Sequence, residues 1–333
     1  MARVAVIILN WNGEKLLQEF LPSVVKNTDP GLGRVVVVDN ASTDTSVEVM
    51  QSEYPQVELV CFDQNYGFAG GYNRAIELCG EEIVVLLNSD VEVAEGWLKP
   101  LVKVLDEAPE VVAVQPKIKS YRHKSQFEYA GACGGFIDYL GFPFCRGRIL
   151  DVTEEDRGQY DDEAEVFWCS GAALCIRRRV YMEAGGLDER FFAHMEEIDL
   201  CWRIRNQGGI IKVCPQAVVY HLGGGSLPMN HPRKLFLNYR NNLLMLYKNL
   251  GVRDWRKICW RRRCLDTVAM LMFLLKGEMA NVKSVIRAYR EFGQMKKEYT
   301  QPETFRQDPC IYPHSLIFKY YFHHIRTFSR LWK

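Results

Sequence analysis

The residues best suited to chemistry follow a run of apolar residues in the first third of the chain. The run Ile83–Leu87 is followed by Asn88, Ser89 and Asp90. This pattern is typical of a strand buried on both faces whose carboxyl end presents polar side chains to a ligand. A carboxylate with an amide and a hydroxyl just before it suits a divalent cation that prefers oxygen ligands and bridges to a diphosphate. The alternative is a strand followed by an Asx turn without a ligand.

A pair of glutamates, Glu196 and Glu197, forms a second chemical centre within the predicted helical segment Phe191–Arg203. On a helical wheel Glu196 falls beside Asp199 and Arg203, where ordinary ion pairs form. Glu197 falls among apolar residues instead. A carboxylate that loses hydration there becomes more basic, which a general base near neutral pH requires. The alternative is that both glutamates begin a helix and stabilise its dipole.

Polar residues also end other predicted strands. They are Asn10 and Asn12 after the first strand, Asp39 after the second and His221 after the last. Parallel neighbours would bring the ends of the first two strands, and Asp90 after the fourth, to one edge of a sheet, where open α/β sheets bind their ligands. A single histidine after a strand is more often structural than a metal ligand.

A glycine-rich segment, Asn65–Asn73, contains Gly67 and Gly71 and opens a predicted helix. Free backbone N–H groups and the helix dipole at such a position favour a phosphate. A dinucleotide-binding fold would place GxGxxG directly after the first strand, where this chain has Asn-Trp-Asn-Gly. The alternative is a glycine-rich turn that binds nothing.

Alternating strands and helices must position these residues. Predicted strands are Val4–Leu9, Val35–Val38, Val57–Phe62, Ile83–Leu87, Phe167–Ile176 and Val218–His221, with helices at Glu14–Lys26 and Tyr72–Leu78. This order predicts an α/β domain with a largely parallel sheet. From Asp106 to Asp162 the pattern weakens into short strands and glycines, and the acidic run Asp151–Glu165 is interpreted as solvated surface.

Charge is distributed unevenly although the net charge is +1. Lys and Arg number 21 against 34 Asp and Glu up to His231, and 21 against 7 beyond it. A basic tail beside an acidic body predicts contact with an anionic surface, and basic residues around Val268–Leu275 fit a helix in the membrane interface. The alternative is a helix packed on the catalytic domain with a solvated basic side. That apolar block is too short to span a bilayer, and nucleic acid is disfavoured because no reading motif is present.

Cysteine usage bears on the compartment. The eleven cysteines include no CxxC pair, and an odd, unpatterned set indicates reduced thiols. The first residues lead directly into a short apolar strand without the features of a signal peptide. We therefore expect a cytoplasmic protein, with the basic tail allowing peripheral contact with the inner face of the plasma membrane.

Taken together, these stretches resemble the family 2 inverting glycosyltransferases of the GT-A fold, particularly rhamnosyltransferase-like bacterial members. The matching stretches, in the family's order, are Val6–Gly13, Val37–Ser42, Asn65–Asn73, Leu87–Asp90, Ser170–Ala173, Phe191–Arg203 and His221. The resemblance implies a GT-A α/β/α sandwich over residues 1–250, with a nucleotide-binding half to about 110 and an acceptor-binding half from 111. Residues 251–333 would form a basic, amphipathic helical extension.

The resemblance also implies roles for individual residues. The residues expected to bind the nucleotide sugar are Asn10, Asn12, Asp39, Asn65, Gly67, Gly71, Asn88 and Ser89. Asp90 and His221 would bind Mn²⁺ or Mg²⁺. Trp168, Ser170 and Gly171 would bind the acceptor. The catalytic base would be Glu197 or Glu196, with Glu197 favoured for its apolar surroundings. Two departures weaken the match: Asn88 replaces the first carboxylate of the family's DxD element, and Glu197 replaces an aspartate.

The implied reaction moves a sugar from a dTDP- or UDP-sugar, with dTDP-rhamnose as the candidate, to a saccharide or lipid-linked acceptor of cell-surface polysaccharide synthesis. Two other functions fit the same residues. A nucleotidyltransferase would use the same sheet edge and metal but release pyrophosphate from a nucleoside triphosphate. A non-catalytic module would bind sugar nucleotides or membranes without turnover.

Overall fold

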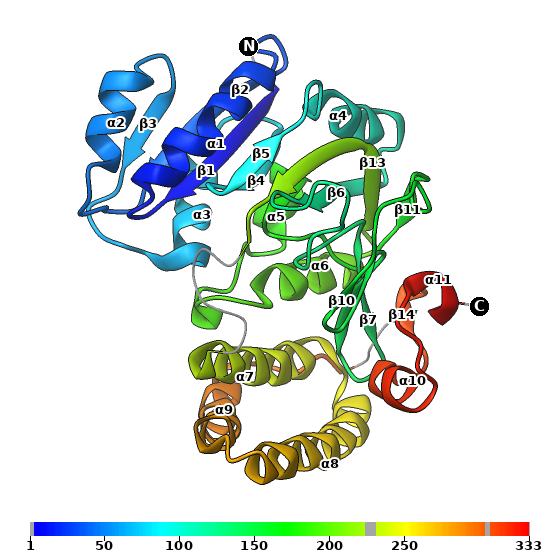
Figure 1. The fold of residues 1–333 in the computed structure, drawn as a ribbon. Helices are drawn as coiled ribbons and strands as arrows, with labels where there is room; N and C mark the ends of the chain where they lie inside the picture. The colour runs from blue at the N-terminus through cyan, green and yellow to red at the C-terminus, as the bar shows by residue number, and fades with distance from the viewer. Residues whose placement is uncertain (1–2, 224–230, 304–306, 333) are drawn as a thin grey trace.

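The computed structural model describes residues 3–223, 231–303 and 307–332, and its centre is a nine-stranded sheet (Figure 1). The strand order is β11-β13-β6-β12-β4-β1-β2-β3, with β5 paired to β13. The first four strands in sequence run parallel to one another, as predicted: β1 (Val4–Asn10), β2 (Gly33–Asp39), β3 (Glu58–Cys61) and β4 (Ile83–Asn88). The others are β5 (Val91–Val93), β6 (Val111–Ser120), β11 (Ala164–Glu165), β12 (Ala173–Arg177) and β13 (Ile210–His221).

Helices cover both faces of this sheet because its central strands are apolar on both sides. On one face, alternate residues of β1 pack with the buried residues of α1 (Glu14–Asn27) and α4 (Leu98–Glu107). On the other face they pack with α3 (Gly67–Leu78), α5 (Arg178–Glu183) and α6 (Glu196–Asn206). The short α2 (Ser46–Glu53) adds Met50 to the first face. Each buried Val, Ile or Leu side chain contributes about 1.5–3 kcal/mol.

Strand β12 is the antiparallel strand nearest the candidate site, and the strand-helix alternation did not predict its direction; β5 and β11 also run antiparallel, to β13. Strand β12 lies between β4 and β6 and is antiparallel to both. The observed strand is shorter than the predicted strand Phe167–Ile176, because regular pairing begins only at Ala173. The antiparallel direction brings the start of β12 to the carboxyl end of β4, where the polar residues are.

The segment from Asp106 to Asp162 builds most of a second sheet, of order β10-β9-β8-β7-β14. Its strands are β7 (Gly135–Asp138), β8 (Pro143–Cys145), β9 (Arg148–Ile149), β10 (Val152–Thr153) and β14 (Ile311–Tyr312). Most carboxylates of the acidic run are exposed, as predicted, but Asp156 pairs with Lys117 and Lys119 and has a side chain only 8% exposed.

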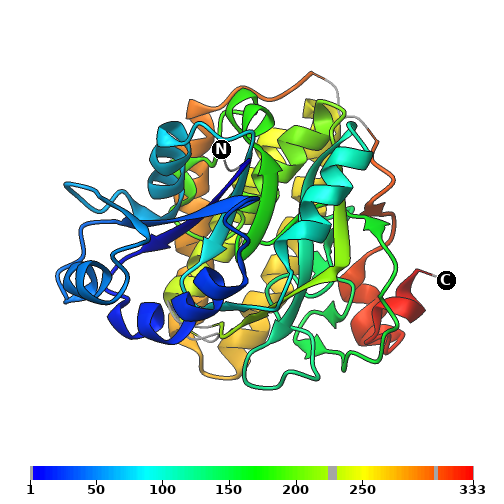
Figure 2. The ribbon, with the colours of Figure 1, turned by 90° about the horizontal axis from the view of Figure 1, so that it is seen from above.

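The basic tail is helical, as expected, but it also contributes β14, which pairs with β7. Its helices are α7 (Pro232–Asn249), α8 (Val252–Leu275), α9 (Met279–Met295), α10 (Leu316–Phe322) and α11 (Phe328–Leu331). The last two lie beside the second sheet, on the side of the molecule away from β3 (Figure 2). In the described part of the chain, no helix has the length and apolar character that crossing a membrane requires.

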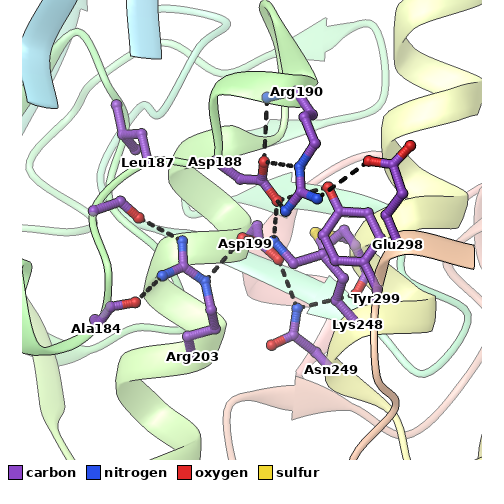
Figure 3. A network of polar contacts seen from close by, with 12 residues as sticks. Ala184, Leu187, Asp188, Arg190, Asp199, Arg203, Lys248, Asn249, Glu298 and Tyr299 are labelled. Carbon is purple, nitrogen blue, oxygen red and sulfur yellow. Dashed lines mark hydrogen bonds and ion pairs between the residues drawn. The ribbon is translucent and has the colours of Figure 1, made fainter. Parts of the chain in front are cut away.

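Polar contacts fasten the tail to the loop and helix that carry the paired glutamates (Figure 3). Lys248 of α7 lies between Asp188, at 2.7 Å, and Asp199 of α6, at 2.8 Å. The Tyr299 hydroxyl donates to Asp188 at 2.7 Å, and Arg203 pairs with Asp199 at 2.9 Å. Burial alone would raise the pKa of Asp188, but its cationic partners hold that pKa well below the ordinary value.

Candidate active site

The carboxyl ends of β1 and β2 form one end of the candidate site. Asn10 and Asp39 are register neighbours, and the Asn10 amide donates to Asp39 Oδ1 at 3.0 Å. The Ser42 backbone N–H donates to the other carboxylate oxygen at 2.9 Å. Asn12, at φ +49°, accepts from the Thr43 N–H at 2.7 Å and so ties the two loops together. Asp39 is buried in a fixed orientation, as recognition of a nucleotide base requires.

Asn40, which the sequence did not single out, connects this pair to the glycine-rich segment. Its amide donates to Asn65 Oδ1 at 3.0 Å and to the Gly67 carbonyl at 3.1 Å. Gly71 packs so closely that a Cβ there would lie 2.7 Å from Leu9 Cδ2. Glycine is therefore required where α3 approaches β1, and the segment predicted to bind phosphate lies against the end of the first strand.

The end of β4 continues the same edge. Asn88 is the register neighbour of Leu9, and its N–H donates to the Ala172 carbonyl at 3.0 Å. Asn88 and Ser89 are half-buried, whereas Asp90 is buried. His221, at the end of β13, has Nε2 3.1 Å from Asp90 Oδ1. The structure therefore brings together the two residues predicted to share a metal.

Glu128 completes this cluster and was missed by the sequence analysis, because the segment around it carries no motif. Its Oε2 lies 3.4 Å from His221 Nδ1. A histidine that ligates a metal usually presents its other ring nitrogen to a carboxylate. Here Nδ1 of His221 faces Glu128, so Nε2 is the nitrogen that could bind a cation. Burial alone would lower the pKa of His221, but the two carboxylates raise it to about 10, so a cation would displace a proton.

The donor set fits a divalent cation that also binds the substrate. Asp90 and His221 supply one carboxylate oxygen and one imidazole nitrogen. The described residues contain no group of three His, Cys, Asp or Glu side chains placed to hold an ion by themselves. The remaining ligands would have to come from a diphosphate and water, which is how Mg²⁺ is usually bound at phosphate sites.

The paired glutamates begin α6 close to this edge. A Cβ placed on Gly171 would lie 3.9 Å from Glu197 Cβ and 3.3 Å from the Phe68 ring. Neither Glu196 Oε2 nor Glu197 Oε2 has a hydrogen-bond partner in the described part of the chain. Burial raises the pKa of both carboxyls, and the charge of Glu197 raises that of Glu196 further.

The helical wheel misplaced Glu196. Asp199 and Arg203 do form an ion pair, but Glu196 takes no part in it and is only 5% exposed, while Glu197 is half-buried. The wheel considers only the neighbours within one helix, whereas the burial of Glu196 comes from elements packed around its first turn. Apolar surroundings therefore do not distinguish Glu197 from Glu196 as the base.

The loop before Glu196 has an unusual backbone, which two residues of α7 hold in place. Phe192, His194 and Met195 have φ of +68°, +71° and +73°, values that L residues rarely adopt. The Asn241 amide donates to the carbonyls of Phe191, Ala193 and His194 at 2.8–2.9 Å. Arg240 donates to the Phe191 carbonyl at 2.9 Å. Burial lowers the pKa of His194 to about 4.

The three predicted acceptor residues are placed differently from one another. Trp168 is 3% exposed and its indole N–H donates to the Phe136 carbonyl at 2.9 Å, so this placement favours a role in the core. Ser170 is also buried, with its N–H donating to Gln115 Oε1 at 2.7 Å. Gly171 is half-buried and lies next to Glu197.

Comparisons with known proteins identify the family and the fold. A family model for glycosyl transferase family 2 matches residues 5–179, more than half of the chain. The chain belongs to glycosyl transferase family 2. It is therefore a glycosyltransferase, and its α/β/α sandwich is the GT-A fold. The Asp90–His221 contact lies at the carboxyl ends of β4 and β13, with the paired glutamates nearby in α6, and open α/β sheets generally bind ligands at such an edge.

The individual relatives and solved structures described next share only 17–26% sequence identity with this chain. An N-acetylglucosaminyl-diphospho-decaprenol L-rhamnosyltransferase of Mycobacterium tuberculosis is 26% identical over 83% of this glycosyltransferase and 90% of its own length. The structure of S. aureus TarS 1-349 with UDP-GlcNAc matches with a TM-score of 0.59 and 18% identity, covering 88% of this chain and 81% of that one. The mannosyltransferase PcManGT of Pyrobaculum calidifontis, solved with GDP-Man and Mn²⁺, matches at 0.52 and 17%, covering 90% and 77%.

Proposed function

We propose that this glycosyltransferase is a metal-dependent, inverting enzyme that moves rhamnose from a nucleotide-diphosphate donor to a lipid-linked saccharide in cell-surface polysaccharide synthesis. The observation that supports it best is the pair of glutamates whose Oε2 atoms are buried and unpartnered, with Glu197 next to Gly171 and so beside the end of β4. The sugar and the acceptor are suggested by the mycobacterial relative, whose name specifies both.

Residues at different places in the site have different roles in the proposed reaction. Asp39, held by Asn10 and Ser42, accepts hydrogen bonds from the nucleotide base. Asp90 and His221 Nε2 hold the cation, which when bound neutralises charge on the departing diphosphate. The glutamate pair accepts the proton of the acceptor hydroxyl, which its raised pKa favours near neutral pH. Attack from the face opposite the leaving group inverts the configuration at C1.

Product analysis tests the reaction type. Incubation with dTDP-rhamnose, Mn²⁺ and a lipid-linked N-acetylglucosamine should release dTDP and give a product of inverted configuration. Release of pyrophosphate from dTTP and a sugar phosphate would support the nucleotidyltransferase alternative instead. Donor binding without turnover, in a thermal-shift screen of nucleotide sugars with Mn²⁺, would support the non-catalytic module.

The proposal includes contact of the tail with an anionic membrane surface. Exposed apolar side chains gather along α8 and the start of α9: Trp260, Val268, Leu271, Met272, Leu274, Leu275, Met279 and Ile286. Leu275 is 88% exposed, and the exposed cations Arg256 and Lys257 lie on the same helix as most of them. Sedimentation with phosphatidylglycerol vesicles should decrease as salt is added. Absence of binding at every salt concentration would support the packed-helix alternative.

A further inference from the structure

A cavity of about 650 Å³ lies between α7, α9 and the loop that precedes the paired glutamates. Its volume falls within the range of about 300–1,000 Å³ typical of small-molecule sites. It is lined by Phe192, Pro232, Arg233, Phe236, Leu237, Arg240, Lys283, Ser284, Arg287 and Glu291. None of these residues binds the nucleotide or the metal, or acts as the base, in the proposed reaction. Binding of the nucleotide-sugar donor in the proposed reaction therefore does not involve this cavity.

The lining has a strong positive charge, with four cationic side chains against one carboxylate. Glu291 is already matched, since Arg287 Nε lies at 2.7 Å and Arg240 at 3.4 Å. Arg233 and Lys283 are exposed, and neither forms an ion pair with a carboxylate of the described residues. Two cations from different helices thus face one cavity without an anion, which favours an anionic ligand.

Apolar groups line the same cavity. Phe192 is 50% exposed and lies under the Arg233 guanidinium, 5.1 Å from the ring centroid. Arg287 lies over the Phe236 ring at 4.6 Å. Arg233 and Arg287 thus both lie over aromatic rings, so charge and apolar surface alternate within a few ångströms. A ligand that fills this space should carry both an anionic group and a hydrocarbon part.

The lining residues place the cavity between the loop before the catalytic helix and the part of α9 that carries exposed apolar side chains. Phe192 belongs to the strained loop, four residues before Glu196, so the cavity adjoins the loop that leads into the catalytic helix. Lys283 lies one turn of α9 after Met279, which is exposed, and Ile286 is exposed beside Arg287. The cavity therefore also adjoins the apolar surface that we propose contacts the membrane.

We propose that this cavity binds the phosphate-bearing head of a lipid-linked acceptor. Arg233 and Lys283 contact the diphosphate, Phe192 and Phe236 contact the first isoprenoid units, and the saccharide extends toward the paired glutamates. The inference rests on the proposed function and adds to it the part of the acceptor that the enzyme recognises. It also explains why cations and aromatic rings face each other on α7 and α9.

Binding measured without transfer tests the cavity itself. Farnesyl diphosphate is titrated into the full chain by calorimetry in EDTA, which keeps the metal-dependent donor site from binding the diphosphate. The Arg233→Ala/Lys283→Ala variant should bind at least about tenfold more weakly, since each charge-assisted hydrogen bond contributes about that factor. Farnesol should bind much more weakly than farnesyl diphosphate to the unaltered chain.

A matched control removes the same charges elsewhere. Lys15 of α1 and Arg179 of α5 are also exposed and lie outside the cavity, so Lys15→Ala/Arg179→Ala should bind farnesyl diphosphate as the unaltered chain does. Equal weakening in both double variants would show a general charge effect and overturn the proposal. Unchanged binding in the cavity variant, or equal binding of farnesol, would overturn it too.

Two further measurements distinguish an acceptor site from a phospholipid site. If the cavity variant loses binding to phosphatidylglycerol vesicles but keeps farnesyl diphosphate, the cavity holds phospholipid headgroups and the proposal is wrong. In transfer assays, the variant should raise KM for a diphosphate-linked acceptor at least about tenfold and leave KM unchanged for an alkyl glycoside of the same sugar. If the unaltered chain transfers sugar to neither acceptor, the proposed function is wrong. The titration with farnesyl diphosphate still tests whether the cavity binds a lipid diphosphate.

Discussion

Replacing Asn241 by leucine should separate catalysis from folding, because this buried side chain holds the loop before the catalytic helix. Its amide donates to three carbonyls of that loop, and its own carbonyl accepts from Arg240 Nε at 2.9 Å. Leucine has nearly the same shape and no polar atoms. Asn241 is fully buried, so water cannot replace the lost bonds without movement of the loop.

The magnitude follows from counting the groups left without partners. The Phe191 carbonyl keeps Arg240, but the carbonyls of Ala193 and His194 lose the Asn241 amide. Each unsatisfied buried acceptor costs about 1–3 kcal/mol, so the two carbonyls should together destabilise the fold of Asn241→Leu by about 2–6 kcal/mol. The loop can relieve this cost by opening, which also releases three positive-φ residues that cost about 1 kcal/mol or more each.

Opening of the loop would move the start of α6 and the glutamates with it. A displacement of about 1 Å at a catalytic group can reduce the rate about a hundredfold, so kcat should fall by about 10–100-fold while KM for the donor stays constant. Urea unfolding measures the stability, and release of nucleoside diphosphate measures kcat. Because domains have about 5–15 kcal/mol of stability, the variant should still fold.

Asn242→Leu provides the matched control. Asn242 is the next residue of α7, is also buried, and donates to the Gly141 carbonyl at 2.6 Å, a contact in the second sheet and not in the catalytic loop. We expect a loss of stability of about 1–3 kcal/mol with unchanged kcat. The reasoning is refuted if Asn241→Leu keeps kcat within twofold, or if both variants lose it equally.

Three other predictions concern the charged residues. Glu197→Gln should reduce turnover by about 10²–10⁴-fold with donor affinity unchanged, as measured by calorimetry; full activity would exclude it as the base. Because burial raises the pKa of both glutamates, kcat/KM should fall as pH decreases through a value well above 4.5, and a flat profile to pH 5 would contradict this. Asp188→Asn should lower the free energy of unfolding, measured in urea, by about 2–3 kcal/mol, a moderate loss because Lys248 still pairs with Asp199. The pKa of Asp188 is lowered in the folded state, so this loss of stability should be present at neutral pH and shrink below pH 3.8.

Several parts of the site could be predicted because they depend on local sequence. Strands buried on both faces need apolar residues throughout, so the polar residues Asp39 and Asn88 identify where β2 and β4 end. Parallel neighbours then place those ends at one edge. The sequence also singled out Gly71, but for phosphate binding, and only the structure shows that a Cβ there would lie 2.7 Å from Leu9 Cδ2. The sequence by itself therefore determined the parallel strands β1 to β4 and the edge at which they end.

Other parts depended on contacts between distant segments. The antiparallel insertion of β12 decides that Gly171 lies next to Glu197, and the neighbouring strands set that direction. Glu128 reaches His221 across more than ninety residues of chain, and Asn241 reaches a loop nearly fifty residues earlier. No periodicity encodes such pairs, because each residue satisfies its own helix or strand equally well without the other. Only the tertiary structure decided which carboxylates are buried and which cations lack a partner, since burial is a property of the surroundings and not of the residue.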